Sequence, residues 1–399
     1  MNAIRSMLAF ATALFALAAP MSTQAQTQAP PPGGPVRIGF ISTLSGPGGA
    51  LGADIRDGFM LGIRHAGGKL GGLPVDLSIA DDQQKPDVGV QVAQRMVQQH
   101  RAHFVTGVVF SNVLLPIAPA ILESRTFYIS PNTGPTEYAG AKCHPFFFVT
   151  SWQSEDVPAA MGKFVNSRGF DNVMLLAANY AGGRESLAGF KREYKGKISD
   201  EVYTALGQLD YSAELATIAA KKPPALFVFL PGGMGINFIK QFAGAGLSQH
   251  TQLVLPGYSA DEDTIRPVGP ALLGTINSSQ WAHDLDNPAN RRFVADFERE
   301  YKRLPTMYAS QGYDTAMLID SAIRRVKGNL EDKEALRRAL LAADFKSVRG
   351  AFKFNKNQYP IQDFYLRIVR KDEQGRITNR TIGKIFENHA DPFAADCRM

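Results

Sequence analysis

Residues 36–52, VRIGFISTLSGPGGALG, contain the pattern that decides how the rest of the chain is interpreted. The apolar run over 36–42 predicts a buried β-strand, and apolar residues spaced four apart predict a helix over 53–66. Between them lies a loop rich in glycine. A strand, a glycine-rich loop and a helix in this order also form the phosphate-binding loops of nucleotide-binding proteins. The outline is therefore that of a nucleotide loop, and its details decide whether it is one.

The nucleotide interpretation fails in those details. A dinucleotide loop that begins at Gly46 needs a third glycine at position 51, and the chain has Leu51 there. No lysine follows as it does in a Walker loop, and Pro47 lacks an N–H that a phosphate cradle would use. We therefore expect a tight strand-to-helix turn whose glycines let the backbone approach a small ligand, with Leu51 adding an apolar surface.

The alternation of strand and helix continues along the chain. One series runs from about 36 to 130, and a second series of similar size runs from 157 to 257. Such an order is typical of parallel sheets that helices cover on both faces. Two α/β lobes leave a cleft between them, and small ligands bind in such clefts. Helices are then expected over 288–303, 308–328 and 331–343, and strands over 348–355, 363–372 and 376–386.

The N-terminal residues differ in composition from the rest. They hold one charged side chain, Arg5, and an apolar run too short to cross a bilayer comfortably, with Thr23 and Ala25 at the −3 and −1 positions of a cleavage site. We interpret 1–25 as a secretory signal peptide cleaved after Ala25, and 26–35 as a flexible leader rich in proline and glycine. A retained membrane anchor is the alternative. No later segment is apolar and long enough to span a membrane, so we expect an exported protein without direct membrane insertion.

The charge pattern argues against nucleic acid as a partner. The formal net charge is +6, but the lysines and arginines are scattered and mixed with acidic residues. No basic stripe with interleaved aromatic residues is present in the sequence. A mild positive field instead favours an anionic small ligand.

The chain has two cysteines, Cys143 and Cys397. In an exported protein two cysteines more often form a disulfide than not. That bond would tie the extreme C-terminus to a mid-chain loop and could stabilise the fold by up to about 5 kcal/mol. Two unpaired thiols, or metal ligation, are the alternatives.

Several segments, taken in order, carry a resemblance to a known family. They are VRIGFISTLSGPGGALGADIRDGFMLGIRHAGG, LPVDLSIADDQQKPDVGVQVAQRMV, SPNTGPTEYAG, YASQGYDTAMLIDSAI and VRGAFKFNKNQ. The chain resembles, over about 36–385, the leucine/isoleucine/valine-binding periplasmic proteins, which are the type I solute-binding proteins of ABC transporters. No single segment is highly specific, but the ordered set together with a signal peptide is.

The resemblance implies an α/β fold of two Rossmann-like lobes, with the ligand in the cleft between them. Lobe 1 would be 36–151 plus 282–349, and lobe 2 would be 152–281 plus 350–399. A three-segment hinge would pass near 151–152, 279–281 and 349–352, and ligand would close the lobes. We then expect a periplasmic monomer that carries a small carboxylate to a membrane permease of an ABC transporter.

The resemblance places the ligand carboxylate at Ser111 and at the residues that follow Pro131. Ser111 comes after a predicted strand and before a predicted helix, so its hydroxyl and the helix N-terminus can receive an anion. Asn132, Thr133 and Gly134 offer amide, hydroxyl and backbone N–H donors. Serine and asparagine are equally favoured as helix caps and in turns, which is the alternative role for these residues.

The remaining expected ligand contacts are apolar or aromatic. Leu51 and Phe110 come from loops of lobe 1, and Tyr180 follows a strand of lobe 2 at the place where the family has an aromatic residue. Trp152 lies at the first crossing, where it could cover the ligand or simply pack the hinge. Tyr258 follows the segment VLPG in a similar position.

The departures from the family pattern bear on the ligand class. Amino-acid binders of the family need an acidic group after the strand that corresponds to QLVLP, and Tyr258 and its neighbour Gly257 stand there. Asp261, Glu262 and Asp263 follow and look like acids at a helix N-terminus. Burying an ammonium group without a carboxylate partner is costly, so an acid without an amine is favoured.

SPNTGPTEYAGAKCHPFFFVTSWQSED also looks like the subgroup that takes up aromatic acids, such as benzoate derivatives and related lignin-type aromatics. A branched-chain or other aliphatic amino acid is the alternative ligand. A sensory module of the same fold is an alternative role.

Enzyme chemistry has little support in the sequence. The chain lacks a Gly-x-Ser-x-Gly elbow and a His-Glu-x-x-His motif. His100 and His103 have a spacing that a metal pair could use, but no third ligand accompanies them, so a solvated helix end is the preferred interpretation. We expect no catalytic residue, no metal and no cofactor.

Overall fold

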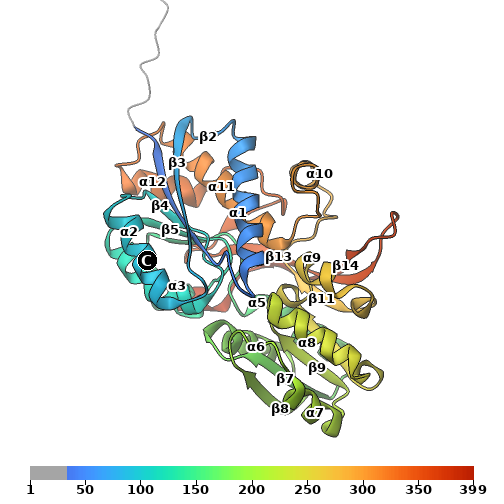
Figure 1. The fold of residues 1–399 in the computed structure, drawn as a ribbon. Coiled ribbons are helices and arrows are strands. Elements are labelled where there is room, and N and C mark those ends of the chain that lie inside the picture. The colour runs from blue at the N-terminus through green and yellow to red at the C-terminus, as the bar shows by residue number, and fades with distance from the viewer. Residues whose placement is uncertain (1–33) are drawn as a thin grey trace, which may run out of the picture. The chain divides into compact units, whose positions relative to one another are not determined.

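The computed structural model describes residues 34–399, which contain two sheets with helices packed around them (Figure 1). The predicted signal peptide, 1–25, and the leader residues 26–33 lie outside the described residues. The predicted α/β class, with alternating strands and helices in two sheets, is confirmed. Within 34–399, no helix is both long and apolar enough to cross a membrane.

The first sheet has six strands in the order β2-β3-β1-β4-β5-β6. They are β1 (Val36–Ser42), β2 (Lys69–Leu70), β3 (Leu73–Asp81), β4 (Phe104–Thr106), β5 (Phe127–Ser130) and β6 (Phe147–Val149). Only β2 runs antiparallel to its neighbour. Because β3 and β4 lie on opposite sides of β1, the chain leaves β1 and β4 in different directions. A crevice therefore opens where these strands end.

The helices of this half follow the strands in the predicted order. They are α1 (Gly49–His65), α2 (Pro86–Gln98), α3 (Ser111–Glu123) and the single turn α4 (Thr136–Ala139). Helix α2 packs against α3, and Figure 1 shows this pair beside the strands that precede them. Because strands such as β4 and β5 are buried on both faces, they are apolar nearly throughout.

The second sheet repeats the same strand order. Its strands are β7 (Asn172–Ala178), β8 (Lys197–Thr204), β9 (Ala225–Phe229), β10 (Gln252–Pro256), β11 (Ile276–Ser279), β12 (Lys353–Phe354), β13 (Pro360–Lys371) and β14 (Ile377–His389). The parallel part runs β8-β7-β9-β10-β11, so a second crevice opens between the ends of β7 and β9. Strands β12, β13 and β14 add an antiparallel edge.

Five helices accompany the second sheet within the described residues. They are α5 (Asp156–Ser167), α6 (Ala181–Glu193), α7 (Ser212–Lys221), α8 (Gly233–Gly244) and α9 (Glu262–Val268). Helix α9 was expected only as a helix start at the acids 261–263, and Asp261 is indeed its N-cap residue.

The chain then returns to the first half through α10 (Pro288–Tyr301), α11 (Met307–Arg325) and α12 (Lys333–Ala342). Helix α11 packs closely on α1, as the resemblance implied for the helices after 285. A Cβ atom at Gly58 would lie 1.9 Å from the carbonyl oxygen of Ala309, and one at Gly312 would lie 2.0 Å from that of Ile55. Glycine is therefore required at both positions for the two backbones to approach.

The strand prediction was incomplete. Strands β2, β6 and β11 were not predicted, because each is only two to four residues long, and β11, INSS, is polar although it is buried. The strand expected over 348–355 shrinks to Lys353–Phe354, because Val348 and Arg349 are held instead by Asp314.

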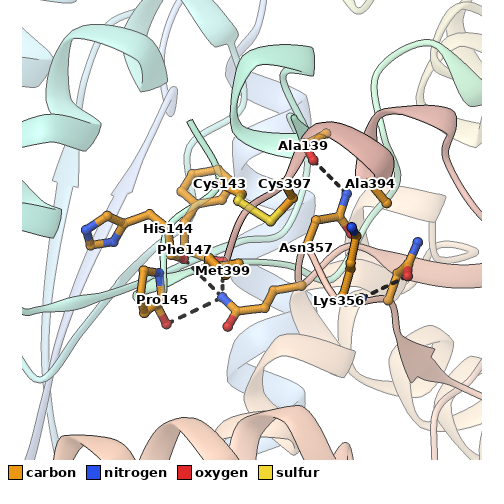
Figure 2. The surroundings of a disulfide bond; sticks show 12 residues. Ala139, Cys143, His144, Pro145, Phe147, Lys356, Asn357, Ala394, Cys397 and Met399 are labelled. Atoms are coloured by element: carbon orange, nitrogen blue, oxygen red, sulfur yellow. Dashed lines mark hydrogen bonds between the residues drawn. A yellow bond between two sulfur atoms is a disulfide. The ribbon is translucent and has the colours of Figure 1, made fainter. Parts of the chain in front are cut away.

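Cys143 and Cys397 form the predicted disulfide, with their Cα atoms 5.6 Å apart (Figure 2). The bond attaches the C-terminal residues to the segment that leads into β6. Two other contacts join the same regions: Val149 N–H donates to the carbonyl of Gln358 at 3.1 Å, and Asn357 Nδ2 donates to that of Ala139 at 2.8 Å. Part of 350–399 thus contacts the first sheet, and the lobe bounds given above stay a prediction.

A buried ion pair lies where the predicted crossing segments meet. Arg349 and Asp314, at 3.0 Å, both have side chains that are almost fully buried. Arg349 also donates to the carbonyls of Thr150 and Ser151 and, at 2.7 Å, to Oε1 of Gln362. One guanidinium group therefore satisfies acceptors from three separate segments of the chain.

We predict that Asp314→Asn lowers the free energy of unfolding by about 3–5 kcal/mol, because it leaves the buried Arg349 charge uncompensated. Urea unfolding followed by circular dichroism measures this change. Asp344→Asn is the matched control, because Asp344 pairs with Arg325 on the surface at 3.9 Å, and its effect should stay below about 1 kcal/mol. Equal effects of the two substitutions would contradict the special role of the buried pair.

Candidate functional site

A cavity lies where the two crevices face each other. It encloses about 400 Å³ of empty space, part of it open to solvent. The residues that line it are Leu51, Val109, Phe110, Ser111, Asn132, Thr133, Trp152, Ser154, Tyr180, Gly182, Phe229, Pro231, Tyr258 and Tyr308. Except for Leu51 and Tyr308, which lie in the first turns of α1 and α11, each lies at the end of a strand or within a few residues after one. The switch points of both sheets therefore build one site.

The glycine-rich loop after β1 forms one edge of this site. As expected, β1 ends at Ser42 and α1 begins at Gly49 after a tight turn, and Leu51 faces the cavity. The carbonyl of Pro47 accepts a hydrogen bond of 2.9 Å from the N–H of Gly233, at the start of α8 in the second half. This loop is therefore a contact between the halves as well as an apolar wall.

Polar groups gather on the side of the cavity that belongs to the first sheet. Ser111 is the first residue of α3, and its Oγ accepts a hydrogen bond of 2.9 Å from Gly182 N–H, which leaves its own O–H free to donate. Asn132 Nδ2 is used internally, because it donates to the carbonyl of Val109 at 2.6 Å. Thr133 lines the cavity, and its side chain carries a hydroxyl group that can donate. Two hydroxyl donors and a helix N-terminus on one side of the cavity form a site that suits an anionic group.

Aromatic rings form most of the remaining wall. Ring centroids lie 6.1 Å apart for Phe110 and Tyr180, 6.0 Å for Tyr180 and Phe229, 5.2 Å for Phe229 and Tyr258, and 5.0 Å for Tyr258 and Trp152. The five rings therefore form a continuous chain across both halves. Such pairs favour flat apolar ligands, because edge-to-face and offset packing extends naturally to a further ring.

No charged side chain is among the lining residues. The three acids after β10 are buried elsewhere: Asp261 pairs with Arg367 at 2.9 Å, and Glu262 accepts hydrogen bonds from Thr378 and Asn379. Burial raises the pKa of Asp263 well above its usual value. The acidic group that an α-amino ligand requires is therefore absent from this wall among the described residues.

Of the nine residues predicted to bind ligand, the structure brings eight together around the cavity. Gly134 is the exception. A Cβ atom at Gly134 would lie 1.9 Å from the carbonyl of Trp152 and 3.0 Å from the Tyr359 ring, so this residue packs behind the loop. Trp152 lines the cavity and packs against the ring of Tyr258, and its role in the hinge stays a prediction.

Six lining residues were missed: Val109, Ser154, Gly182, Phe229, Pro231 and Tyr308. Phe229 and Pro231 end the predicted strand ALFVFLP, so the rule that selected Tyr180 could have found them. Tyr308 gave no such signal, because it reaches the cavity only through the packing of α11 on α1.

The histidine pair is not a metal site. His103 is buried, not solvated as expected, and its Nδ1 accepts a hydrogen bond of 3.0 Å from Arg37 N–H. Burial, with the charge of Arg37 nearby, lowers its pKa to about 4. Across the described part of the chain, no group of three or more His, Cys, Asp or Glu residues is placed to hold a metal ion.

A second contact across the cavity involves a buried acid. Glu185, in α6, accepts a hydrogen bond of 2.8 Å from the N–H of Thr136, which begins α4 in the first half. Its other oxygen is buried and has no partner among residues 34–399. Burial raises the pKa of Glu185 to about 7, against the hydrogen bond from Thr136 N–H, which lowers it.

Comparison with known proteins gives a consistent picture. A family model described as periplasmic binding protein matches residues 35–374. Leu/Ile/Val-binding protein homolog 6 of Brucella melitensis is 24% identical over 366 residues, which cover 90% of this chain and 93% of that protein.

Two solved structures are also similar to this chain. A solute-binding protein of an ABC transporter from R. palustris, in complex with benzoate, is 31% identical, with a TM-score of 0.87 and coverage of 92% of this chain and 100% of that one. Another, from Rhodopseudomonas palustris BisB5 in complex with 3,4-dihydroxybenzoic acid, is 26% identical, with a TM-score of 0.82 and coverage of 89% and 98%.

We predict that Glu185→Gln changes how stability depends on pH. The pKa of the native carboxyl group is raised from 4.5 to about 7, so the native state binds a proton that the unfolded state has released between these values. The wild type should therefore lose stability relative to Glu185→Gln as the pH rises from about 4.5 to about 7. Urea unfolding at several pH values measures the difference, with the exposed Glu334→Gln as control for the lost charge. A difference that does not vary with pH would contradict the prediction.

Proposed function

Because this chain belongs to the periplasmic binding protein family, we propose that it captures a small aromatic carboxylic acid, such as a benzoate derivative, and delivers it to the permease of an ABC importer. The observation that carries the proposal is the composition of the cavity. Hydroxyl donors and a helix N-terminus lie on one side, six of the fourteen lining residues are aromatic, and no lining residue is charged. The bound benzoate and 3,4-dihydroxybenzoic acid of the two similar structures support the same ligand class.

The ligand carboxylate would lie against Ser111 and Thr133. The N–H groups of Ser111 and Asn112 precede the first hydrogen bonds of α3, which Val113 and Leu114 make to the carbonyl of Phe110, and the helix dipole favours negative charge there. Hydrogen bonds to a charged oxygen contribute about 1.5–3 kcal/mol each. The carboxylate therefore finds both donors and a favourable field without a basic side chain.

The ring of the ligand would pack between the aromatic residues of the two halves. Phe110 and Trp152 come from the first half and its crossing, and Phe229 and Tyr258 come from the second. A flat ring that touches both groups gains apolar contact only when the halves are close together. The hydrogen bonds from Gly182 to Ser111 and from Gly233 to Pro47 would then fix that closed arrangement.

A branched-chain amino acid is the second candidate ligand, because the similar Brucella protein is named a Leu/Ile/Val-binding protein homolog. The cavity disfavours it, since an α-ammonium group would be buried with no carboxylate among the lining residues. A sensing role with the same ligand is compatible with the same cavity. Binding without turnover is proposed in either case, so the protein is not an enzyme.

The export pathway is part of the proposal. We infer that residues 1–25 direct secretion and are cleaved after Ala25, and that the mature protein acts in the periplasm as a monomer. The disulfide between Cys143 and Cys397 fits such an oxidising compartment.

Ligand binding should raise the melting temperature of the mature protein. Benzoate at a free concentration one hundred times its Kd should stabilise the native state by about 2.7 kcal/mol. A thermal-shift series with benzoate, 4-hydroxybenzoate, 3,4-dihydroxybenzoate, leucine and valine measures the effect. A shift with leucine or valine while all aromatic acids are inert would exclude the proposed ligand class, and turnover of any ligand would exclude a pure binding protein.

Thr133→Val should weaken benzoate binding by about tenfold to a hundredfold, because it removes a hydroxyl donor to a charged oxygen while keeping the shape of the side chain. Isothermal titration calorimetry measures the Kd. Thr217→Val is the control, since Thr217 lies on α7, is not among the residues that line the cavity, and donates to the carbonyl of Ala213. If both variants bind benzoate as the wild type does, Thr133 does not contact the carboxylate.

A further inference from the structure

We propose that the C-terminal part of the chain positions the ligand loop. The ligand loop is residues 131–135, and the C-terminal clamp is defined here as residues 355–359 together with 391–397. The clamp lies behind the loop and does not line the cavity. Its proposed action on affinity rests on the proposed function, but its action on the loop can be measured without any ligand.

The loop is held through its backbone carbonyls. Ser151 Oγ donates to the carbonyl of Asn132 at 2.5 Å, Ser130 Oγ donates to that of Thr133 at 2.6 Å, and Ser154 N–H donates to that of Gly134 at 2.8 Å. These three donors come from the strand ends beside the loop. Together they set where Asn132 and Thr133 face the cavity.

The fourth carbonyl, that of Pro135, accepts hydrogen bonds of 3.1 Å from the N–H groups of Tyr138 and Ala139 in α4, and a further one from the clamp. Tyr359, which is fully buried, donates its hydroxyl to this carbonyl at 2.8 Å. Its ring also lies against Gly134, where a Cβ atom would come within 3.0 Å of it. Tyr359 therefore supports the loop from behind by one hydrogen bond and one close contact, and it touches no part of the cavity.

Tyr359 is held in turn by its neighbours in the clamp. Asn357 Nδ2 donates to the carbonyl of Ala139, at the end of α4, at 2.8 Å and to Oδ2 of Asp391 at 3.0 Å. Asp391 also accepts a hydrogen bond of 3.1 Å from Ala394 N–H in the C-terminal turn, Pro392–Asp396. Both segments of the clamp thus meet at one buried amide (Figure 2).

The disulfide closes the clamp. Figure 2 shows the Cys143–Cys397 bond beside Asn357 and the segment that contains Gln358. Gln358 Nε2 donates to the carbonyl of Phe147 at 2.6 Å. The backbone carbonyl of Gln358 accepts a hydrogen bond from Val149 N–H. The chain 355–359 is therefore fixed to β6 on one side and to the C-terminal turn on the other.

This arrangement gives the clamp a way to change affinity. A loop that moves in the free protein must be ordered when ligand binds, and ordering costs binding free energy. A loop already held in place avoids that cost. Weakening the clamp should therefore raise Kd while leaving every ligand contact intact.

The test uses Tyr359→Phe, which keeps the ring and removes only the hydroxyl, and wild-type protein reduced with a phosphine. Hydrogen–deuterium exchange of a peptide spanning 130–139, in the absence of ligand, reports the loop directly. Exchange should become several-fold faster in both samples. Tyr203→Phe is the matched control, because Tyr203 also donates one hydrogen bond, at 2.6 Å to Glu201, but its side chain is exposed on β8.

Benzoate binding is measured on the same samples. The Kd should rise about two- to tenfold in Tyr359→Phe, as the loss of one hydrogen bond predicts. The effects of Tyr359→Phe and Thr133→Val should be less than additive, because the first acts through the loop that carries the second.

The proposal is overturned if hydrogen–deuterium exchange of 130–139 is unchanged in both samples. It is also overturned if the Kd for benzoate rises without faster exchange. If circular dichroism shows that the reduced protein is unfolded, the exchange rate of Tyr359→Phe alone tests the proposal. If the wild type does not bind benzoate, the proposed function fails and the exchange experiment still decides the clamp.

Discussion

One buried charge determines how the chain passes between its two sheets. The guanidinium group of Arg349 lies between Asp314, the carbonyls after β6 and the side chain of Gln362. A buried charge is tolerated only when its partners surround it with good geometry. The segments that contribute those partners therefore cannot separate independently. The two strand-end crevices face each other because the crossings are held in this way.

The chemistry of the cavity depends on the charged side chains that are buried elsewhere as well as on the residues that line it. Asp261 is neutralised by Arg367, and Glu262 is satisfied by β14, so these acids stay inside the second half. The cavity is left with aromatic rings and hydroxyl groups. An anion is received by neutral donors and a helix N-terminus, and a cation would find no partner among the lining residues. The proposed preference for an acid without an amine rests on this arrangement.

The residues of the site were largely predictable because they obey one positional rule. Ser111, Thr133 and Tyr180 each follow a predicted strand, and in a parallel sheet such residues meet at one edge. The rule applies equally to Phe229, whose strand was correctly predicted although its end was not considered. It fails for Tyr308, because that residue reaches the cavity from a helix that returns from elsewhere in the chain. It also misassigns Gly134, since the rule does not tell which side of a loop faces the ligand.

The sequence by itself determined the order of strands and helices, the likeness to a family and the residue types available to a ligand. Periodic apolar runs specify local structure because each side of a strand or helix must be buried or solvated. Only the tertiary structure decided that the acids after β10 turn away from the cavity, and that Tyr359 and the C-terminal residues lie behind the ligand loop. These outcomes depend on partners distant in the chain, such as Arg367 for Asp261, and no local pattern encodes which distant partner a side chain will meet.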